Sequence, residues 1–239
     1  MRFCLALAAV IGLGGTLEAS PKAPVVVLDP GHGGSNLGAQ GAVADLREKH
    51  LTLTLANQVA DRLRGKGITV ELTRSNDRTL TLRQRVEIAN QLPADLFVSI
   101  HANASPTRAQ RGFETYVLTA KGVDVDARAL RSATTTPRPG VDPEIALVLD
   151  DLERGASQWE SAELAARMQK ALRDRRGGEG DRGVRQDAQH VLLGATMPAV
   201  LVEVGFIDHP IEGKQLADPA VQAQLASAIA EAIEDQLAD

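Results

Sequence analysis

The chain has 239 residues, of which 44% are hydrophobic and only 3% aromatic, so a core would consist mainly of Val, Leu, Ile and Ala. Its 31 acidic residues outnumber its 26 basic ones, and the formal charge of −5 argues against nucleic acid as the partner. After residue 20 no stretch is long and apolar enough to span a bilayer, so we expect no transmembrane helix in the mature chain.

The first twenty residues are typical of a signal peptide. Arg2 gives a short positive start, residues 4–13 are apolar, and small residues follow up to Ser20. We therefore predict a signal peptide over residues 1–20, export to the periplasm or cell envelope, with the extracellular space as the alternative, and one domain over residues 24–239. Cys4, the only cysteine, lies in the leader, which excludes disulfides and cysteine catalysis in the mature chain.

Apolar runs alternate with helical periodicity along the rest of the chain. The patterns predict strands at 25–28, 68–72, 96–100, 113–118, 191–193 and 199–204, and helices at 51–64, 80–92, 158–172 and 219–237. A short helix is expected at 142–154, and Ser157 with Glu160 is expected to cap the helix that follows. Segments 132–141 and 173–183 are predicted loops. Strands alternating with helices predict an α/β sheet with helices on both faces.

Two of these strands end in a histidine. His32 lies in the loop Asp-Pro-Gly-His-Gly-Gly over residues 29–34, and His101 directly follows the strand at 96–100. Loops at the carboxyl ends of parallel strands are where α/β sheets place their sites, and glycine lets the backbone approach a ligand closely. Two strands that each deliver one histidine to this edge suggest a metal site.

Two glutamates complete a hypothesis for the chemistry. Glu48 directly precedes the first helix, and Glu203 lies in the last apolar strand, where a carboxylate is costly unless it is paired or acts on a metal or a proton. Two histidines with one glutamate are a known ligand set of catalytic zinc. We therefore expect His32, Glu48 and His101 to bind one Zn²⁺ and Glu203 to act as the general base. The HExxH motif of helical zinc proteases is absent.

Four segments together make the chain resemble the zinc-dependent N-acetylmuramoyl-L-alanine amidases, the family to which the bacterial cell-division amidases belong. They are Leu-Asp-Pro-Gly-His-Gly-Gly at 28–34, Arg-Glu-Lys at 47–49, Val-Ser-Ile-His-Ala-Asn at 98–103 and Pro-Ala-Val-Leu-Val-Glu-Val-Gly-Phe-Ile at 198–207. The resemblance runs from about residue 25 to the C-terminus. It implies a twisted, mostly parallel six-stranded sheet with flanking helices, and hydrolysis of the amide between N-acetylmuramic acid and L-alanine in peptidoglycan.

The resemblance also implies roles for single residues. His32, Glu48 and His101 would hold zinc and Glu203 would be the catalytic carboxylate, in agreement with the reading from the residues alone. Cell-division members often carry an inserted helix that occludes the zinc until an activator protein moves it. The interval 119–157 occupies the corresponding place, so we treat it as a regulatory insertion, with Glu144 as the residue that would reach the metal. An ordinary solvated acidic face is the alternative.

Each candidate also has a structural interpretation. Either histidine could serve packing alone, Glu48 could be a helix-start carboxylate, and Glu203 could form a buried ion pair with Arg83 or Arg185. Asn103 is expected to orient His101 or the substrate. We expect four other residues, Lys49, His50, His190 and His209, to be surface, loop or structural residues rather than ligands.

Two other functions compete with the amidase. A zinc peptidase of the same fold would need a pocket for a free peptide terminus, and no motif selects one. A non-catalytic protein that binds the cell wall or activates another enzyme would be expected to have lost one of the four site residues. All four are present.

Overall fold

The computed structural model describes residues 22–118, 140, 143–187 and 190–238. The predicted signal peptide and most of the interval that precedes residue 143 therefore lie outside the described residues. Among the helices of the described part, none combines the length and the hydrophobicity that a membrane crossing requires.

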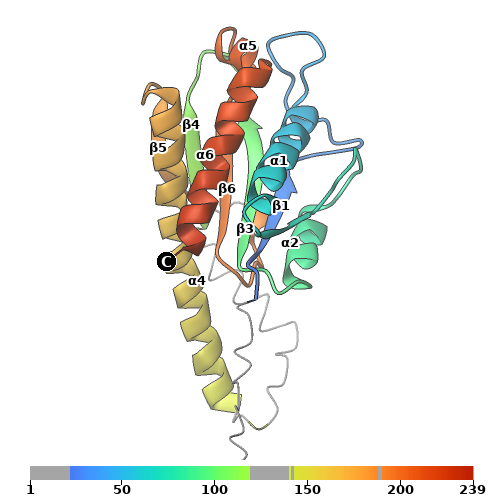
Figure 1. Cartoon of the computed structure of the whole chain (residues 1–239). Helices are drawn as coiled ribbons and strands as arrows, with labels where there is room; N and C mark the ends of the chain where they lie inside the picture. The colour runs from blue at the N-terminus through green and yellow to red at the C-terminus, as the bar shows by residue number, and fades with distance from the viewer. Residues whose placement is uncertain (1–21, 119–139, 141–142, 188–189, 239) are drawn as a thin grey trace, which may run out of the picture.

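Six strands form one sheet in the order β2-β1-β3-β6-β4-β5 (Figure 1). Four of the five neighbouring pairs are parallel, and only β4 and β6 are antiparallel. This confirms the expected mostly parallel six-stranded sheet. The strands are β1 (Val25–Pro30), β2 (Thr69–Leu72), β3 (Leu96–Asn103), β4 (Phe113–Leu118), β5 (Asp181–Asp187) and β6 (Ala199–Phe206).

Helices cover the two faces of the sheet unequally. The long helices α1 (Glu48–Arg64), α4 (Pro143–Arg176) and α6 (Pro219–Leu237) pack over one face and enclose the larger hydrophobic core (Figure 1). The second face carries a smaller core, to which α2 (Leu82–Asn90) and the 3₁₀ helix η1 (His190–Leu192) contribute. A short helix α5 (Glu212–Leu216) follows β6. The prediction of helices on both faces is confirmed, and the second face has the lighter cover.

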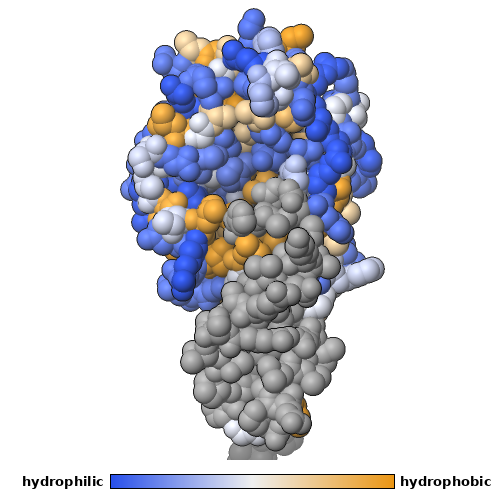
Figure 2. Space-filling model, turned by 180° about the vertical axis from the view of Figure 1, so that it is seen from behind, coloured by the Kyte–Doolittle hydropathy of each residue, from blue (hydrophilic) through white to orange (hydrophobic). Residues whose placement is uncertain are grey.

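The alternation of side chains along the strands decides which face carries the polar residues. Val27, Phe97 and Leu201 lie in the smaller core. Because successive side chains of a strand point to opposite faces, residues two positions further along lie on the same face as these three. Those residues are polar: Asp29, Ser99 and Glu203. Seen from behind, the upper part of the molecule is largely hydrophilic, and hydrophobic residues gather below it (Figure 2).

Two of the predicted elements are wrong. The segment 173–183 was expected to be a loop, but α4 continues to Arg176 and β5 begins at Asp181. The apolar run 191–193 was expected to be a strand, but it contributes to the 3₁₀ helix η1. A run of three apolar residues is too short to distinguish the two conformations. β5 is an edge strand paired only with β4, so it does not need the apolar residues that mark a central strand.

The expected break between two helices near Ser157 is also wrong, because α4 is one continuous helix of 34 residues. Ser157 does not cap a helix start; its backbone carbonyl accepts a hydrogen bond from the hydroxyl of Ser161, at 2.6 Å, within the helix. Gly155 is the weakest helix former nearby, but one glycine costs only about 1 kcal/mol, too little to end a long helix. The amino-terminal part of α4 extends well beyond the sheet (Figure 1).

Replacing Gly155 with alanine tests the continuity of α4. The residue is exposed, and a Cβ there would meet nothing within 4 Å. We expect Gly155→Ala to stabilise the protein by up to about 1 kcal/mol, measured by chemical denaturation. Gly112→Ala is the matched control and should destabilise, because Gly112 has a φ of +109° and its Cβ would lie 2.1 Å from the Gly180 carbonyl. Loss of stability in Gly155→Ala would mean that the helix breaks at this residue.

Candidate metal centre

The loop after β1 presents His32 in an unusual backbone conformation. His32 has a φ of +61°, a region that residues other than glycine rarely adopt, and Gly33 follows with a φ of +123°. Gly31 lies directly under the ring of His101, since a Cβ at Gly31 would come within 2.4 Å of that ring. A glycine is therefore required where the two histidines approach each other.

A fully buried carboxylate fixes the start of this loop. Asp29 accepts hydrogen bonds from the hydroxyls of Thr73 and Ser99, at 2.5 and 2.7 Å, and forms an ion pair with Arg85 at 2.7 Å. Arg85 also donates to the backbone carbonyl of His32 at 2.6 Å. One ion pair thus connects β1, α2 and the loop that carries His32.

A second buried arginine supports the same loop from below. Arg74 is completely buried and donates to the backbone carbonyls of Pro30, Gly31 and Lys49, at 2.8 to 2.9 Å. These carbonyls come from the loop and from the first turn of α1. Arg74 therefore holds the His32 loop and the Glu48 end of α1 in a fixed relation.

Backbone amides orient Glu48 at the start of α1. Its Oε2 accepts from the amide of Ala39 at 2.8 Å, and its Oε1 accepts from the amide of Ala102 at 3.1 Å. The residue is buried, with 4% of its surface exposed. Placing Glu48 in the first turn of a helix also favours its negative charge through the helix dipole.

The structure brings His32, Glu48 and His101 together. Glu48 Oε1 lies 2.9 Å from His32 Nε2 and 3.0 Å from His101 Nδ1. The ligand atoms of all three residues lie within 4.8 Å of one another. Asn36 Oδ1, 2.9 Å from His32 Nδ1, is placed to accept a hydrogen bond from that nitrogen, and in this tautomer the Nε2 lone pair faces the cluster.

Glu48 and His32 change the proton affinities of each other, and His101 adds to the change at Glu48. Burial opposes the charged form of Glu48, but hydrogen bonds from His101 and His32 outweigh it and lower the pKa of the carboxyl well below its usual range. Burial likewise opposes protonation of His32, but the hydrogen bond and the charge of Glu48 raise the pKa of its ring. The cluster therefore favours a positive charge at its centre.

The donor set fits a catalytic zinc ion. Two imidazole nitrogens and one carboxylate oxygen are preferred zinc donors, and tetrahedral coordination places them about 3.4 Å apart, a spacing similar to the distances in the cluster. Three protein ligands leave a fourth position for water or substrate, as in catalytic sites. The second hydrogen bonds of Glu48 and His32 supply the orientation that metal ligands need.

Glu203 lies next to this cluster and has an unsatisfied oxygen. It pairs in register with His101 across β3 and β6. Its Oε2 is buried and has no hydrogen-bond partner. Burial, followed by the negative charges of Glu48 and Glu114, raises the pKa of Glu203 well above its usual value. A carboxyl group poised in this way is a candidate acid or base.

A second carboxylate, which the sequence analysis missed, lies beside Glu203. Glu114 pairs in register with Glu203 across β4 and β6, and only 2% of its surface is exposed. Its Oε1 accepts hydrogen bonds from Asn103 and Tyr116, at 2.8 and 3.0 Å, and its Oε2 accepts from Arg182 at 2.9 Å. Both carboxylate oxygens of Glu114 thus have hydrogen-bond donors, whereas one oxygen of Glu203 has none.

The structure decides several of the alternative interpretations. Among the described residues Glu203 has no ion-pair partner, because Arg83 pairs with Glu87 and Arg185 lies near Glu114 instead. Asn103 donates to Glu114, and neither histidine of the cluster is its partner. The side chains of two residues considered above, Glu144 and His190, lie outside the described part.

Lys49 is not the surface residue that was expected. It is buried, donates to the carbonyl of Gly34 at 3.0 Å and pairs with Asp77 at 2.7 Å, which ties α1 to the glycine loop. His50 is exposed and His209 lies in a turn after β6, as expected.

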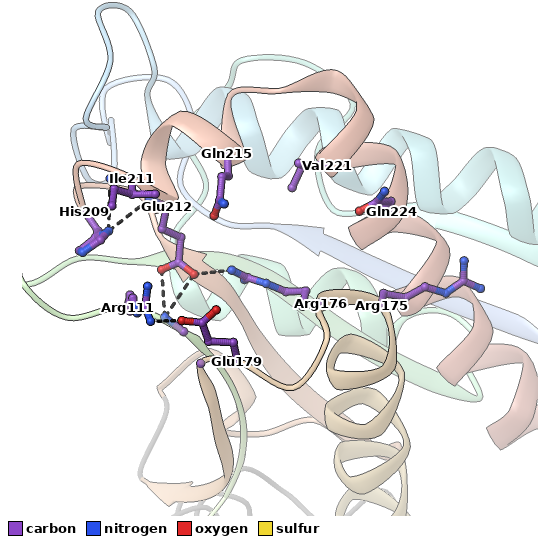
Figure 3. A pocket seen from close by; sticks show the side chains of 12 residues that line it. Arg111, Arg175, Arg176, Glu179, His209, Ile211, Glu212, Gln215, Val221 and Gln224 are labelled. Atoms are coloured by element: carbon purple, nitrogen blue, oxygen red, sulfur yellow. Dashed lines mark hydrogen bonds and ion pairs between the residues drawn. The ribbon is translucent and has the colours of Figure 1, made fainter.

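A pocket of about 250 Å³ lies elsewhere, among the end of α4, the segments just before β4 and β5, α5 and the start of α6 (Figure 3). Its charged residues are already paired: Arg176 with Glu212, and Arg111 with Glu179. Glu212 also accepts from the amides of Gly112 and Phe206. No proposed metal ligand lines this pocket. Its ion pairs and hydrogen bonds hold the surrounding segments together.

Comparison with known proteins places this geometry among enzymes of one kind. A family model described as N-acetylmuramoyl-L-alanine amidase matches residues 26–235. The N-acetylmuramoyl-L-alanine amidase AmiA of Escherichia coli (strain K12) is 36% identical over 217 residues, which cover 87% of this chain and 74% of that protein. The catalytic domain of CwlV, an N-acetylmuramoyl-L-alanine amidase from Bacillus (Paenibacillus) polymyxa var. colistinus, is 33% identical with a TM-score of 0.65. The N-acetylmuramoyl-L-alanine amidase AmiC2 of Nostoc punctiforme is 29% identical with a TM-score of 0.69. Each of these two matches covers 90% of this chain and 98% of the chain of the solved structure.

The ionisation of Tyr116 tests the hydrogen bonds around Glu114. Burial, then the hydrogen bond to Glu114 and its charge, raise the pKa of Tyr116 to about 12 from the usual 10.0. Because Tyr116 is the only tyrosine of the chain, absorbance at the tyrosinate band reports it alone. The folded protein should hold this proton to higher pH than the denatured chain, and Glu114→Gln should shift the pKa toward 10. An ordinary pKa in the folded wild type would contradict this arrangement.

Proposed function

The chain belongs to the N-acetylmuramoyl-L-alanine amidase family, and from this premise we propose how its residues hydrolyse the amide between N-acetylmuramic acid and L-alanine in peptidoglycan. His32, Glu48 and His101 would hold one zinc ion. When bound, zinc would make a water molecule more acidic and polarise the scissile carbonyl. The observation that carries this proposal is the convergence of three ligand atoms beside a carboxyl group with a free, buried oxygen.

Glu203 is the proposed proton-transfer residue. It takes one proton from the attacking water, whose oxygen bonds to the lactyl carbonyl carbon. When the carbon–nitrogen bond breaks, the same carboxyl group returns the proton to the departing nitrogen of L-alanine. The products are a lactyl carboxylate and a stem peptide with a free amino group. Burial and the charges of Glu48 and Glu114 raise the pKa of Glu203, and this supports the role, because a transfer group must hold the proton between its removal from water and its delivery to nitrogen.

Glu114 is a fixed neighbour of Glu203 in this step. Its three hydrogen-bond donors hold it beside Glu203, where its negative charge favours the protonated form of Glu203. The two adjacent carboxylates therefore have different roles, since Glu203 has a buried oxygen without a hydrogen-bond partner and both oxygens of Glu114 are bonded. A wall-binding protein without catalysis would not need this difference.

Substitution of Glu203 separates metal binding from turnover. On purified peptidoglycan, we expect the mature chain to release stem peptides that begin with L-alanine, and a chelator to abolish the release. Glu203→Gln should retain zinc, measured by elemental analysis, but lose at least about a hundredfold in rate. His32→Ala should lose zinc and activity together.

The matched control for this experiment is Glu163→Gln. Glu163 is exposed on α4, and its substitution removes the same charge as Glu203→Gln. It should leave both zinc content and rate unchanged. A near-normal rate in Glu203→Gln would overturn the role of Glu203, and release of fragments that do not begin with L-alanine would overturn the assigned bond specificity.

Export and regulation are further parts of the proposal. The apolar leader at residues 1–20 supports export to the periplasm or cell envelope, where peptidoglycan lies, and a role in wall remodelling that includes cell division. We propose that the interval 119–157 restrains the enzyme and that an activator protein relieves the restraint. The length of this interval and its place between β4 and the sheet-packed part of α4 support the proposal.

Shortening the interval tests the restraint. A variant that lacks residues 142–154 should cleave peptidoglycan several times faster than the full mature chain, because the proposed restraint would be removed. Circular dichroism and thermal unfolding would verify that the shortened protein is folded. An unchanged rate in a folded variant would contradict regulation by this segment.

A further inference from the structure

Side chains from four strands form a row across the open face of the sheet. His101 of β3 pairs in register with Glu203 of β6, and Glu203 pairs with Glu114 of β4. Arg182 and Arg185 of β5 complete the row through their contacts with Glu114. The proposed metal ligands thus lie at one end of the row and two arginines at the other.

The two arginines are held very differently. Arg182 donates to Glu114 at 2.9 Å and to Gln110 at 3.3 Å, and its guanidinium stacks 5.0 Å from the centre of the Phe206 ring. Arg185 has a single long contact of 3.5 Å with Glu114, and half of its side chain is exposed. Among the residues that the structure describes, the Arg185 guanidinium has no other partner.

Glu114 does not need Arg185 as a partner. Asn103, Tyr116 and Arg182 already supply three hydrogen bonds to its two oxygens. The firmly held positive charge next to Glu114 is therefore Arg182. Arg185 is half exposed, and most of its five N–H donors have no partner among the described residues. A guanidinium is suited to bidentate binding of a carboxylate.

The spacing of the row matches the length of a short peptide. Neighbouring strands lie about 4.8 Å apart, so the Arg185 guanidinium near β4 is between one and two strand spacings, roughly 5–10 Å, from Glu203. An extended peptide advances about 3.3–3.6 Å per residue. A chain that starts at the amide beside Glu203 and crosses β4 would bring its second residue to Arg185.

We propose that Arg185 binds a free carboxylate on the second residue of the stem peptide and so selects acidic over amidated stems. This proposal rests on the proposed amidase function and adds the direction in which the substrate lies: the glycan on the side of the metal ligands and the stem across β4 toward β5. Arg182 is a positioning residue that holds Glu114.

The test compares two soluble muramoyl-peptide fragments, one with a carboxylate and one with a carboxamide at the second stem residue. With the zinc-loaded enzyme, Arg185→Ala should lower kcat/KM for the carboxylate fragment about tenfold and leave the carboxamide fragment nearly unchanged. Most of the change should be in KM. Arg185→Lys should recover part of the loss, and more salt should weaken the preference of the wild type.

Equilibrium binding gives a readout without turnover. In the Glu203→Gln background, calorimetry should show that Arg185→Ala weakens binding of the carboxylate fragment only. Arg175→Ala is the matched control, because Arg175 is an exposed arginine at the end of α4, paired with Glu231 on the helical side of the sheet. In Arg185→Ala the pKa of Tyr116 should stay raised or rise slightly, because the charge of Arg185 lowers it; a fall toward 10 would mean that the contacts of Glu114 are lost.

Each outcome decides one question. Equal losses on both fragments would mean that Arg185 acts only through Glu114, and no loss on either would mean that it does not contact the stem; both overturn the proposal. A wild type that releases no stem peptide beginning with L-alanine from either fragment would instead overturn the proposed function.

Discussion

The ion pair between Asp29 and Arg85 is the constraint on which the site depends. Asp29 sits completely buried at the end of β1, and Arg85 reaches from α2 to this carboxylate and to the carbonyl of His32. The loop between them contains a histidine with a positive φ, which is costly without external support. Because breaking a buried pair leaves an uncompensated charge, the loop and α2 are fixed as one unit.

The predictable part of the fold is the part that is buried. β1, β3 and β6 are recognisable as apolar runs because parallel central strands are covered on both faces, and α6 is recognisable by its periodicity and by Pro219 at its first turn. β5 was not predicted as a strand, because Val184 is the only apolar residue in Asp181–Asp187. Its strand conformation comes from pairing with β4, which no local pattern records.

The same distinction applies to the site. His32, Glu48, His101 and Glu203 stand in short, recognisable segments, and the structure places them together. Glu114 looked like an ordinary outward-facing residue of an alternating strand. Its importance arises from the antiparallel register of β4 with β6, a long-range property that local sequence does not contain.

That register gives the site its asymmetry. If two adjacent carboxylates were both unpartnered, they would share protons and neither would have a fixed role. Asn103, Tyr116 and Arg182 satisfy both oxygens of Glu114, whereas Glu203 keeps a buried oxygen without a partner. Burial, followed by the charges of Glu48 and Glu114, raises the pKa of Glu203. The pairing of β4 with β6, the only antiparallel pair among the described strands, therefore places a satisfied carboxylate beside the proposed proton-transfer residue Glu203.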